Sequence, residues 1–324
     1  MNESAPIRAL ATAVGTLFAP GGMRGCLSTL IYHRVLTKPD ELNPNEVDAD
    51  TFEQQMRLLA EHCHVLPLDE AIERLYTRSL PARAVCVTFD DGYADNATIA
   101  SPILRRYGLS ATFFVSTGYL DGGRMWNDTV IEAIRRAPDD VLDLTAEGFG
   151  VLPIGSINQR IHAFQCLIDN IKYRSAEERI EITEAIAARV GAVLPDNLMM
   201  SSDQVRDLHA AGMTIGAHTV NHPILARSSN HVAREEIANS RSRLQEIIGK
   251  SVELFAYPNG KPGCDYLSEH VDIVREFGFK AAVSTAWGVA TATTDRWQLP
   301  RFTPWDRHPL RFLARLYWNC HRHV

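Results

Sequence analysis

Short apolar runs of strand length recur along the chain, and longer segments with helical periodicity lie between most of them. The runs are 27–32, 84–89, 111–116, 213–217, 253–257 and 280–284, with a weaker one at 297–302. The helix-like segments are 51–62, 96–108, 230–249 and 266–278, of which the last three close on a glycine, as helices often do. Continuous apolar runs are typical of strands buried on both faces. The pattern predicts a parallel α/β sheet, open or closed into a barrel.

The alternation of strands and helices breaks between about 120 and 212. Residues 126–138 and 175–191 read as helices, the second opened by a capping box of Ser175 and Glu178, with a loop-rich patch between them. We interpret this region as a helical insertion on the same core. The chain then divides into an N-terminal segment, 1–25, and a single domain, 26–324, that includes the insertion.

Composition and charge narrow the class of protein. The 324 residues are 45% hydrophobic, which is enough for one large core or two smaller ones. The net charge of −6 comes without a basic block, which argues against nucleic acid as a partner because phosphate binding needs clustered cations. The six cysteines form no CxxC pair, so neither a zinc ribbon nor a disulfide framework is indicated, and a reducing compartment is favoured.

The two ends of the chain suggest no transmembrane segment. The apolar stretch 9–22 is too short to span a bilayer, follows a single basic residue, Arg8, and is preceded by Glu3. We expect an amphipathic or buried segment and a cytoplasmic protein, with a degenerate signal peptide as the alternative. Residues 311–324 read as an amphipathic helix docked on the barrel or on a partner.

Polar residues of functional types follow the apolar runs. Because the carboxyl ends of parallel strands converge, ligands gather there. The residues at these positions are His33, Asp90 and Asp91, His218 and His222, Pro258 and Asn259, and Arg301. The sequence therefore predicts a site at one end of the sheet.

Two histidines and one carboxylate form a common open catalytic zinc site. His218 and His222 are four residues apart, but Pro223 disfavours a helix there, so we expect a turn. Gly92 lets the chain reverse so that Asp90 and Asp91 can both reach one cavity, one as a metal ligand and one as a base. The alternatives are two polar loop histidines, and an Asx turn or helix cap at the aspartates.

Three motifs in this order carry a family resemblance. "TFDDG" at 88–92, "HTVNH" at 218–222 and "FAYPNG" at 255–260 resemble those of the polysaccharide deacetylases, the NodB-homology domain of carbohydrate esterase family four, over roughly 26–305. The resemblance implies a deformed (β/α) barrel of parallel strands. It also implies metal-dependent hydrolysis of an N-acetyl group on a sugar.

The resemblance assigns roles to motif residues. Asp90 would be the general base, and Asp91, His218 and His222 would bind a divalent metal. Zinc is the default from this ligand set, and cobalt, nickel or iron fit similar ligands. A backbone N–H near Tyr93 would help hold the oxyanion.

Further substrate contacts are expected from the third motif and from the insertion. The third motif contributes Tyr257, Pro258 and Asn259 to this set. Trp126 could stack on a sugar ring, or it could pack the insertion onto the barrel with Asn127 or Asp128 as a helix cap. Trp287 and Trp305 are further possible sugar platforms.

The sequence departs from the family pattern in two places. Ala256 stands where the third motif usually carries an arginine that orients the catalytic aspartate, and Arg301 could supply that cation from another strand end. No C-terminal "LxxH" motif precedes His308. Instead "LIYHRV" at 30–35 resembles a subgroup, the exopolysaccharide poly-N-acetylglucosamine deacetylases, whose barrel strands are circularly permuted. This likeness makes His33 the expected general acid, with a histidine that only links strand and loop as the alternative.

These observations predict a metal-dependent deacetylase that acts on N-acetylated amino sugars of a bacterial polysaccharide or its precursor. The expected partner is an N-acetylated glycan rather than a nucleic acid, and the oligomeric state is left open. A non-catalytic carbohydrate-binding protein is the alternative suggested by Ala256. A glycoside hydrolase is disfavoured, because its two carboxylates flank the scissile bond and cannot be neighbours such as Asp90 and Asp91.

Overall fold

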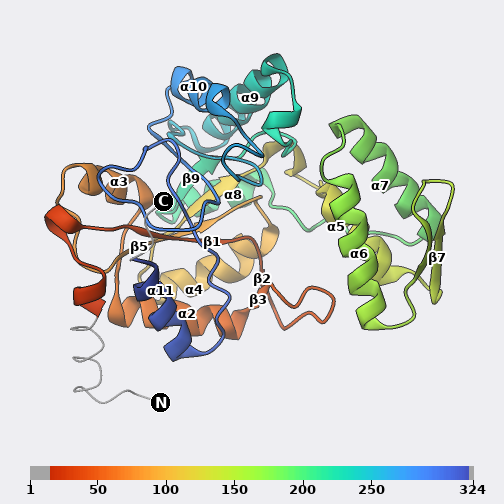
Figure 1. Cartoon of the computed structure of the whole chain (residues 1–324), viewed down its shortest axis with the longest axis horizontal. Coiled ribbons are helices and arrows are strands. Elements are labelled where there is room, and N and C mark those ends of the chain that lie inside the picture. Colours follow the sequence, from red (N-terminus) through yellow and green to blue (C-terminus); the bar gives the residue numbers. More distant parts are fainter. Residues whose placement is uncertain (1–14, 321–324) are drawn as a thin grey trace.

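The apolar runs form the strands of one curled parallel sheet (Figure 1). The structure is a computed structural model that describes residues 15–320. In sheet order the strands are β1 (Ser28–Tyr32), β5 (Ala84–Phe89), β6 (Thr112–Val115), β9 (Thr214–Ala217), β10 (Leu254–Ala256) and β11 (Ala281–Val283), and β4 (His64–Val65) also pairs with β5. Nearly all of their residues are buried, as expected for strands covered on both faces.

Residues 299–302 join the two edges of this sheet. On one side the Phe302 N–H donates to Thr29 O and the Ile31 N–H donates to Phe302 O, each at 3.1 Å. On the other side the Leu299 N–H donates to Ala282 O at 2.9 Å. The weak strand expected at 297–302 is therefore reduced to isolated bridges, because Pro300 has no N–H to extend a ladder. The expected deformed barrel is confirmed.

Helices surround the barrel, and its core is aromatic. They are α2 (Ala49–His62), α3 (Leu68–Tyr76), the π-helical η2 (Asn96–Ala100) running into α4 (Ser101–Arg106), α8 (Ser202–Ala210), α9 (Asn230–Ile248), α10 (Ser268–Glu276) and α11 (Pro309–Asn319). Inside, Phe89 stacks on Phe113 at 4.8 Å between ring centroids. The expected C-terminal helix is α11, which packs on α2.

Short elements complete the described chain. They are η1 (Gly22–Arg24), the paired strands β2 (Val35–Leu36) and β3 (Val47–Asp48), η3 (Thr117–Tyr119) and η4 (Leu225–Arg227). Of the expected segment 9–22, residues 15–22 are described, and 15–18 form a helical turn. Within 15–320, none of the helices has the length and apolar character needed to cross a membrane.

The insertion forms a separate lobe beside the barrel (Figure 1). It contains α5 (Trp126–Arg136), the antiparallel pair β7 (Val141–Leu144) and β8 (Gly150–Pro153), α6 (Ile157–Ile171) and α7 (Ala176–Val190). These elements share their own apolar cluster, in which Val130, Ile134 and Leu167 are fully buried. The capping box of Ser175 and Glu178 is present.

The structure refines the expectation for the insertion in two ways. The patch between its two expected helices contains a hairpin and α6, and α6 opens with a capping box of Ser156 and Gln159 that the sequence analysis missed. The last helix of the range, α8, instead packs against β9 of the barrel.

We expect Gly216→Ala to destabilise the barrel. A methyl group at Gly216 in β9 would overlap the ring of Phe114, which is fully buried. Overpacking of this kind costs about 1–3 kcal/mol of the free energy of unfolding. Urea denaturation measures the change, and an unaltered midpoint would show that the ring has room to shift.

Candidate active site

A pocket of about 230 Å³ lies where the barrel meets the insertion. Barrel loops contribute His33, Asp90, Asp91, His218, His222, Asn259 and Thr285 to its lining, and the insertion and its leading loop contribute Met125, Trp126, Asn127, Ile168 and Lys172. Of the residues that the sequence analysis placed at strand ends, all except Pro258 and Arg301 therefore share one cavity with side chains of the inserted lobe.

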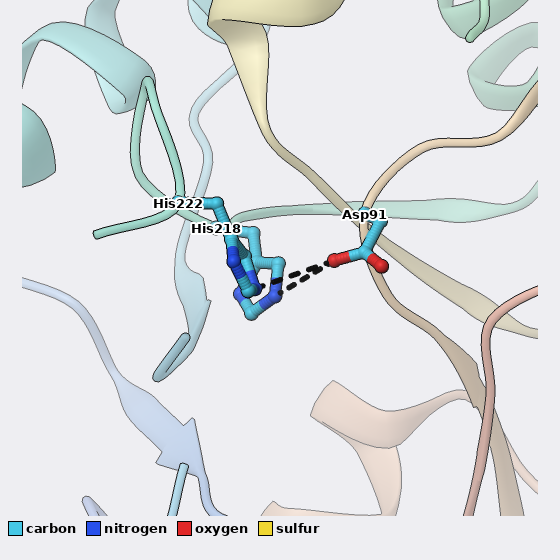
Figure 2. Close-up of side chains that lie close together, drawn as sticks. All are labelled: Asp91, His218 and His222. Atoms are coloured by element: carbon cyan, nitrogen blue, oxygen red, sulfur yellow. Dashed lines mark ion pairs between the residues drawn. The ribbon is translucent and has the colours of Figure 1, made fainter. Parts of the chain in front are cut away.

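Asp91, His218 and His222 point toward one another (Figure 2). The Asp91 Oδ1 atom lies 3.4 Å from the Nε2 atom of each histidine, and one ligand atom from each of the three residues lies within 4.8 Å of the others. Two imidazole nitrogens and a carboxylate oxygen form a donor set that suits a divalent cation with a position left open.

The turn after β5 directs Asp91 into the pocket. Asp91 has a φ of 76° and Gly92 a φ of 93°, and aspartate tolerates this left-handed region better than most residues. Ser116, at the end of β6, fixes the turn because its N–H donates to Asp91 O at 3.1 Å. The Ser116 hydroxyl donates to His218 O at 2.9 Å. One buried serine thereby links two of the clustered residues.

A buried glutamate holds the turn between the two histidines. Glu236, on α9, accepts hydrogen bonds from the N–H groups of Val220 and Asn221 and from the Asn221 amide, each at 2.8 Å. The turn includes left-handed backbone at Thr219 and at His222, so it needs this support. The sequence analysis missed Glu236, since nothing in the helical pattern distinguishes it.

The hydrogen bonds of the cluster are consistent with a metal site. The Nδ1–H of His218 donates to Ala256 O at 2.8 Å, which leaves its Nε2 unprotonated in the neutral ring and available to a cation. Among the described residues, the buried Asp91 Oδ1 and His222 Nδ1 have no hydrogen-bond partner. A buried carboxylate oxygen without a partner is costly, and a cation bound between Asp91 and the histidines would remove that cost.

Asp90 is paired with Arg301 inside the barrel. Arg301 Nη1 and Nη2 donate to Asp90 Oδ1 and Oδ2, both at 2.7 Å, and the two residues are only 1% and 2% exposed. Arg301 Nε donates to Ser284 O at 3.0 Å, and Nη1 also donates to Thr88 Oγ1 at 3.1 Å. This bidentate geometry fixes the orientation of the carboxylate. The third motif has Ala256 where an arginine was expected to orient this aspartate. In the structure the Arg301 guanidinium binds the Asp90 carboxylate instead.

Electrostatics keep both carboxylates ionised. Burial raises the pKa of Asp90, but its interactions with Arg301, His218 and His33 together outweigh burial and the net pKa lies below the usual value. Burial raises the pKa of Asp91, but its interactions with the nearby histidines together outweigh burial and the net pKa is also lowered. Two adjacent aspartates are tolerated because each has its own positively charged or hydrogen-bonding partner.

The histidines differ in the direction of their pKa shifts. Burial lowers the pKa of His222 to about 3. Burial also lowers the pKa of His218, but the charges of Asp90 and Asp91 outweigh it and the net pKa is raised. At neutral pH the His222 ring is therefore neutral, which is the form of imidazole that can bind a cation.

The remaining expected site residues divide between the pocket and the core. His33, Asn259 and Trp126 line the pocket. Tyr257 does not line the pocket. Its ring is fully buried and stacks on Tyr266, with 3.8 Å between the ring centroids, and its hydroxyl group donates a hydrogen bond to Trp297 O.

Other residues also lie away from the pocket. Pro258 is buried beside Tyr257 and outside the pocket lining. The side chain of Tyr93 packs on Met125 and Met199 beneath Arg34. The side chains of Tyr257 and Pro258, expected to contact substrate, thus lie outside the pocket lining, whereas the role expected near Tyr93 concerns its backbone N–H and not its buried side chain.

The other candidate aromatic and polar residues have separate places. Trp287 and Trp305 pack on each other at 4.8 Å between ring centroids, and Trp287 donates to Asn319 Oδ1 of α11, away from the pocket lining. Asn127 lines the pocket. Asp128 is buried, and burial raises the pKa of its carboxyl to about 7. Lys172, which also lines the pocket, was missed because α6 was not expected.

We expect Arg301→Met to lower the free energy of unfolding by about 3–5 kcal/mol, because the buried Asp90 carboxylate loses its partner. Asp90→Leu combined with Arg301→Met should recover most of this loss, since no buried charge then remains. Chemical denaturation of the wild type, Arg301→Met and the double variant measures the loss and its recovery.

Arg243→Met is the matched control for this experiment. Arg243 is half exposed and lies 3.8 Å from Asp121 at the surface, so its removal should change the free energy of unfolding by less than about 0.5 kcal/mol. Equal losses from Arg301→Met and Arg243→Met would contradict the importance of the buried pair.

Comparison with known proteins gives a consistent picture. A family model described as polysaccharide deacetylase matches residues 77–152 and 158–282, more than half of the chain. YxkH of Bacillus subtilis (strain 168) is 20% identical over 278 residues, which cover 85% of this chain and 70% of that protein.

Solved structures share the fold. The Streptococcus pyogenes deacetylase PplD, in complex with acetate, matches with a TM-score of 0.61 and 22% identity, over 92% of this chain and 99% of that chain. IcaB from Ammonifex degensii matches with a TM-score of 0.57 and 21% identity, over 91% of this chain and 97% of that chain. At these identities the structures support the architecture of the barrel.

Proposed function

Since this chain belongs to the polysaccharide deacetylase family, we propose that it is a metal-dependent hydrolase that removes N-acetyl groups from amino sugars of a bacterial polysaccharide or its precursor. The observation that carries the proposal is the pairing of two sites in one pocket. Asp90, held by Arg301, lies beside the cluster of Asp91, His218 and His222. A fixed carboxylate base next to a cation site is the arrangement that amide hydrolysis by water requires.

In the proposed mechanism Asp91, His218 and His222 would hold a divalent metal, with zinc as the first choice and cobalt, nickel or iron as alternatives. Such a metal would supply Lewis acidity toward the acetyl carbonyl and toward a water molecule. Asp90 accepts the proton from the attacking water. Arg301 keeps the Asp90 carboxylate ionised and correctly oriented for this step.

The developing negative charge on the acetyl oxygen needs a hydrogen-bond donor. The backbone bridge between Tyr93 and Met199 uses the Ala94 N–H and the Gly92 carbonyl, so the Tyr93 N–H lies outside these bonds. We assign this N–H to the oxyanion. The role comes from the backbone of Tyr93, whose side chain is part of the core.

Collapse of the tetrahedral intermediate breaks the carbon–nitrogen bond and needs a proton on the leaving amine. His33 lines the pocket with Asp90 and is the proposed donor of that proton. Trp126 offers an aromatic face to the sugar ring, and Asn127 and Asn259 offer amide groups to its hydroxyls. Acetate, the ligand named with PplD, is the second product of the proposed reaction.

The binding-only alternative rested on Ala256. The bidentate contact from Arg301 to Asp90 argues against it. The third motif lacks its arginine, but Arg301, within residues 299–302, supplies the cation that contacts the aspartate. Turnover therefore has the better support.

Substitution of the two aspartates should separate metal binding from chemistry. Asp91→Asn removes a charged ligand and should weaken metal binding by about 10-fold or more, whereas Asp90→Asn should retain the metal and lower kcat by about 10²–10⁴-fold. Competition of a chelator for Co²⁺, followed by absorbance, measures affinity, and acetate release from N-acetylglucosamine oligomers measures turnover.

Asp207→Asn on the exposed face of α8 is the control for both measurements. Equal loss of metal from Asp90→Asn and Asp91→Asn would contradict the division of roles. Release of no acetate by the metal-loaded wild type from a broad panel of acetylated glycans would refute the proposed activity.

His33→Gln should affect substrates according to their leaving group. Deacetylation of a glycan should slow by about 10²–10⁴-fold, because an amine must be protonated as it leaves. Hydrolysis of 4-nitrophenyl acetate should change much less, since 4-nitrophenolate leaves without a proton. A parallel loss for both substrates would assign His33 a structural role.

A further inference from the structure

A second pocket adjoins the candidate active site. It has a volume of about 330 Å³, within the range of small-molecule sites. Its polar and aromatic lining includes Tyr119, Arg124, Trp126, Thr129, Arg179, Glu184 and Asn221. Trp126 lines both pockets, and Asn221 belongs to the turn between the two clustered histidines. A chain of sugars bound at the active site could therefore extend into the second pocket.

Arg179, on α7, is buried in this pocket without a charged partner. Arg179 is only 4% exposed, and its Nε atom has no hydrogen-bond partner among residues 15–320. The guanidinium lies over the Trp126 ring, 5.3 Å from its centroid. Within the described chain no carboxylate forms an ion pair with it. Burial lowers the pKa of Arg179, and the charges of Glu236 and Glu177 offset this only in part, so the buried guanidinium costs stability.

Three other arginines of the inserted lobe, unlike Arg179, are paired with glutamates. Arg135 and Arg136 both contact Glu132, and Arg189, further along α7, lies 3.1 Å from Glu147. The lobe thus contains acids that pair with these three cations.

Arg124 gives the second pocket another cation. Its Nε donates to Thr129 Oγ1 at 3.0 Å and its Nη1 donates to Pro195 O, and neither acceptor is charged. Glu184, on the exposed face of α7, is the acid in the lining. The two arginines therefore outnumber the acid, and the acid lies toward solvent.

We infer that this second pocket binds an anionic group, a carboxylate or a phosphate, carried by the unit next to the N-acetylated sugar. The inference rests on the proposed function, and it makes the substrate an acidic glycan or a phosphorylated precursor. Guanidinium groups form paired hydrogen bonds with both kinds of oxyanion. Trp126 would then contact the sugar on one face and support Arg179 on the other. Lys172, in the active-site pocket, adds a cation along the same path.

The test compares three substrates that share N-acetylglucosamine. They are a neutral oligomer, an oligosaccharide in which N-acetylglucosamine alternates with glucuronic acid, and a nucleoside-diphosphate N-acetylglucosamine. The wild type should have a higher kcat/KM for one of the charged substrates than for the neutral one, which also identifies the anion. Arg179→Gln should lower this charged-to-neutral ratio by about tenfold or more, as loss of a charge-assisted hydrogen bond does.

Two variants control for charge and for folding. Arg179→Lys keeps the charge without the paired donors and should retain part of the ratio. Arg189→Gln lies on the same helix but at the surface, and it should leave the ratio at the wild-type value. A wild-type ratio near one, unaltered by Arg179→Gln, would overturn the inference while the proposed deacetylation stands.

Binding measurements decide the matter if turnover is absent. Calorimetric titration with the glucuronic acid oligosaccharide should give a dissociation constant that rises about tenfold or more in Arg179→Gln and increases with salt concentration. Equal affinity of the wild type for the neutral and acidic oligosaccharides would overturn the inference. Tight binding of the acidic one without acetate release would uphold the anion site and reject the proposed function.

Discussion

The buried ion pair between Asp90 and Arg301 is the interaction on which the rest of the structure depends. It joins the end of β5 to residues 299–302, the segment that closes the barrel. A pair this deep is stable only if its remaining donors are satisfied, and Ser284 and Thr88 accept from the same guanidinium. The same ion pair therefore links the closing segment to the barrel and orients the Asp90 carboxylate, the proposed base. The arginine that the family carries in its third motif is replaced from a distant part of the chain.

Much of the fold could be predicted because both-face burial leaves a clear signal. Strands β1, β5, β6, β9, β10 and β11 coincide with the apolar runs to within a residue or two, and the expected deformed barrel and family are confirmed. The hairpin of the insertion was missed because its strands are half exposed and short. Helix α6 was missed although Ser156 and Gln159 form a capping box, since the preceding loop residues dominate the local pattern.

The sequence predicts the residues of the site only where they directly follow a strand. His33, Asp90, Asp91, His218, His222 and Asn259 all reach one pocket, because parallel strands bring their carboxyl ends together. Tyr257 follows β10 as well, yet its ring turns into the core against Tyr266, and sequence spacing does not reveal that choice. Glu236 lies on α9 and Lys172 directly follows α6. Only tertiary packing brings these two residues to the histidine turn and to the pocket. Their roles become visible only when the two histidines and the inserted lobe are seen in space.

Chemistry and recognition are divided between the two parts of the fold. The barrel supplies the clustered aspartates and histidines from strand ends, where backbone hydrogen bonds hold each residue rigidly. The inserted lobe supplies Trp126 and Lys172 on one side and Arg179 on the other, from helices with their own apolar core. Because that core lies mostly outside the barrel, the proposed substrate contacts of the lobe can change with little effect on Asp90 or Arg301. Under the proposed function, the lobe is therefore the part of this chain in which selectivity for a particular glycan can evolve.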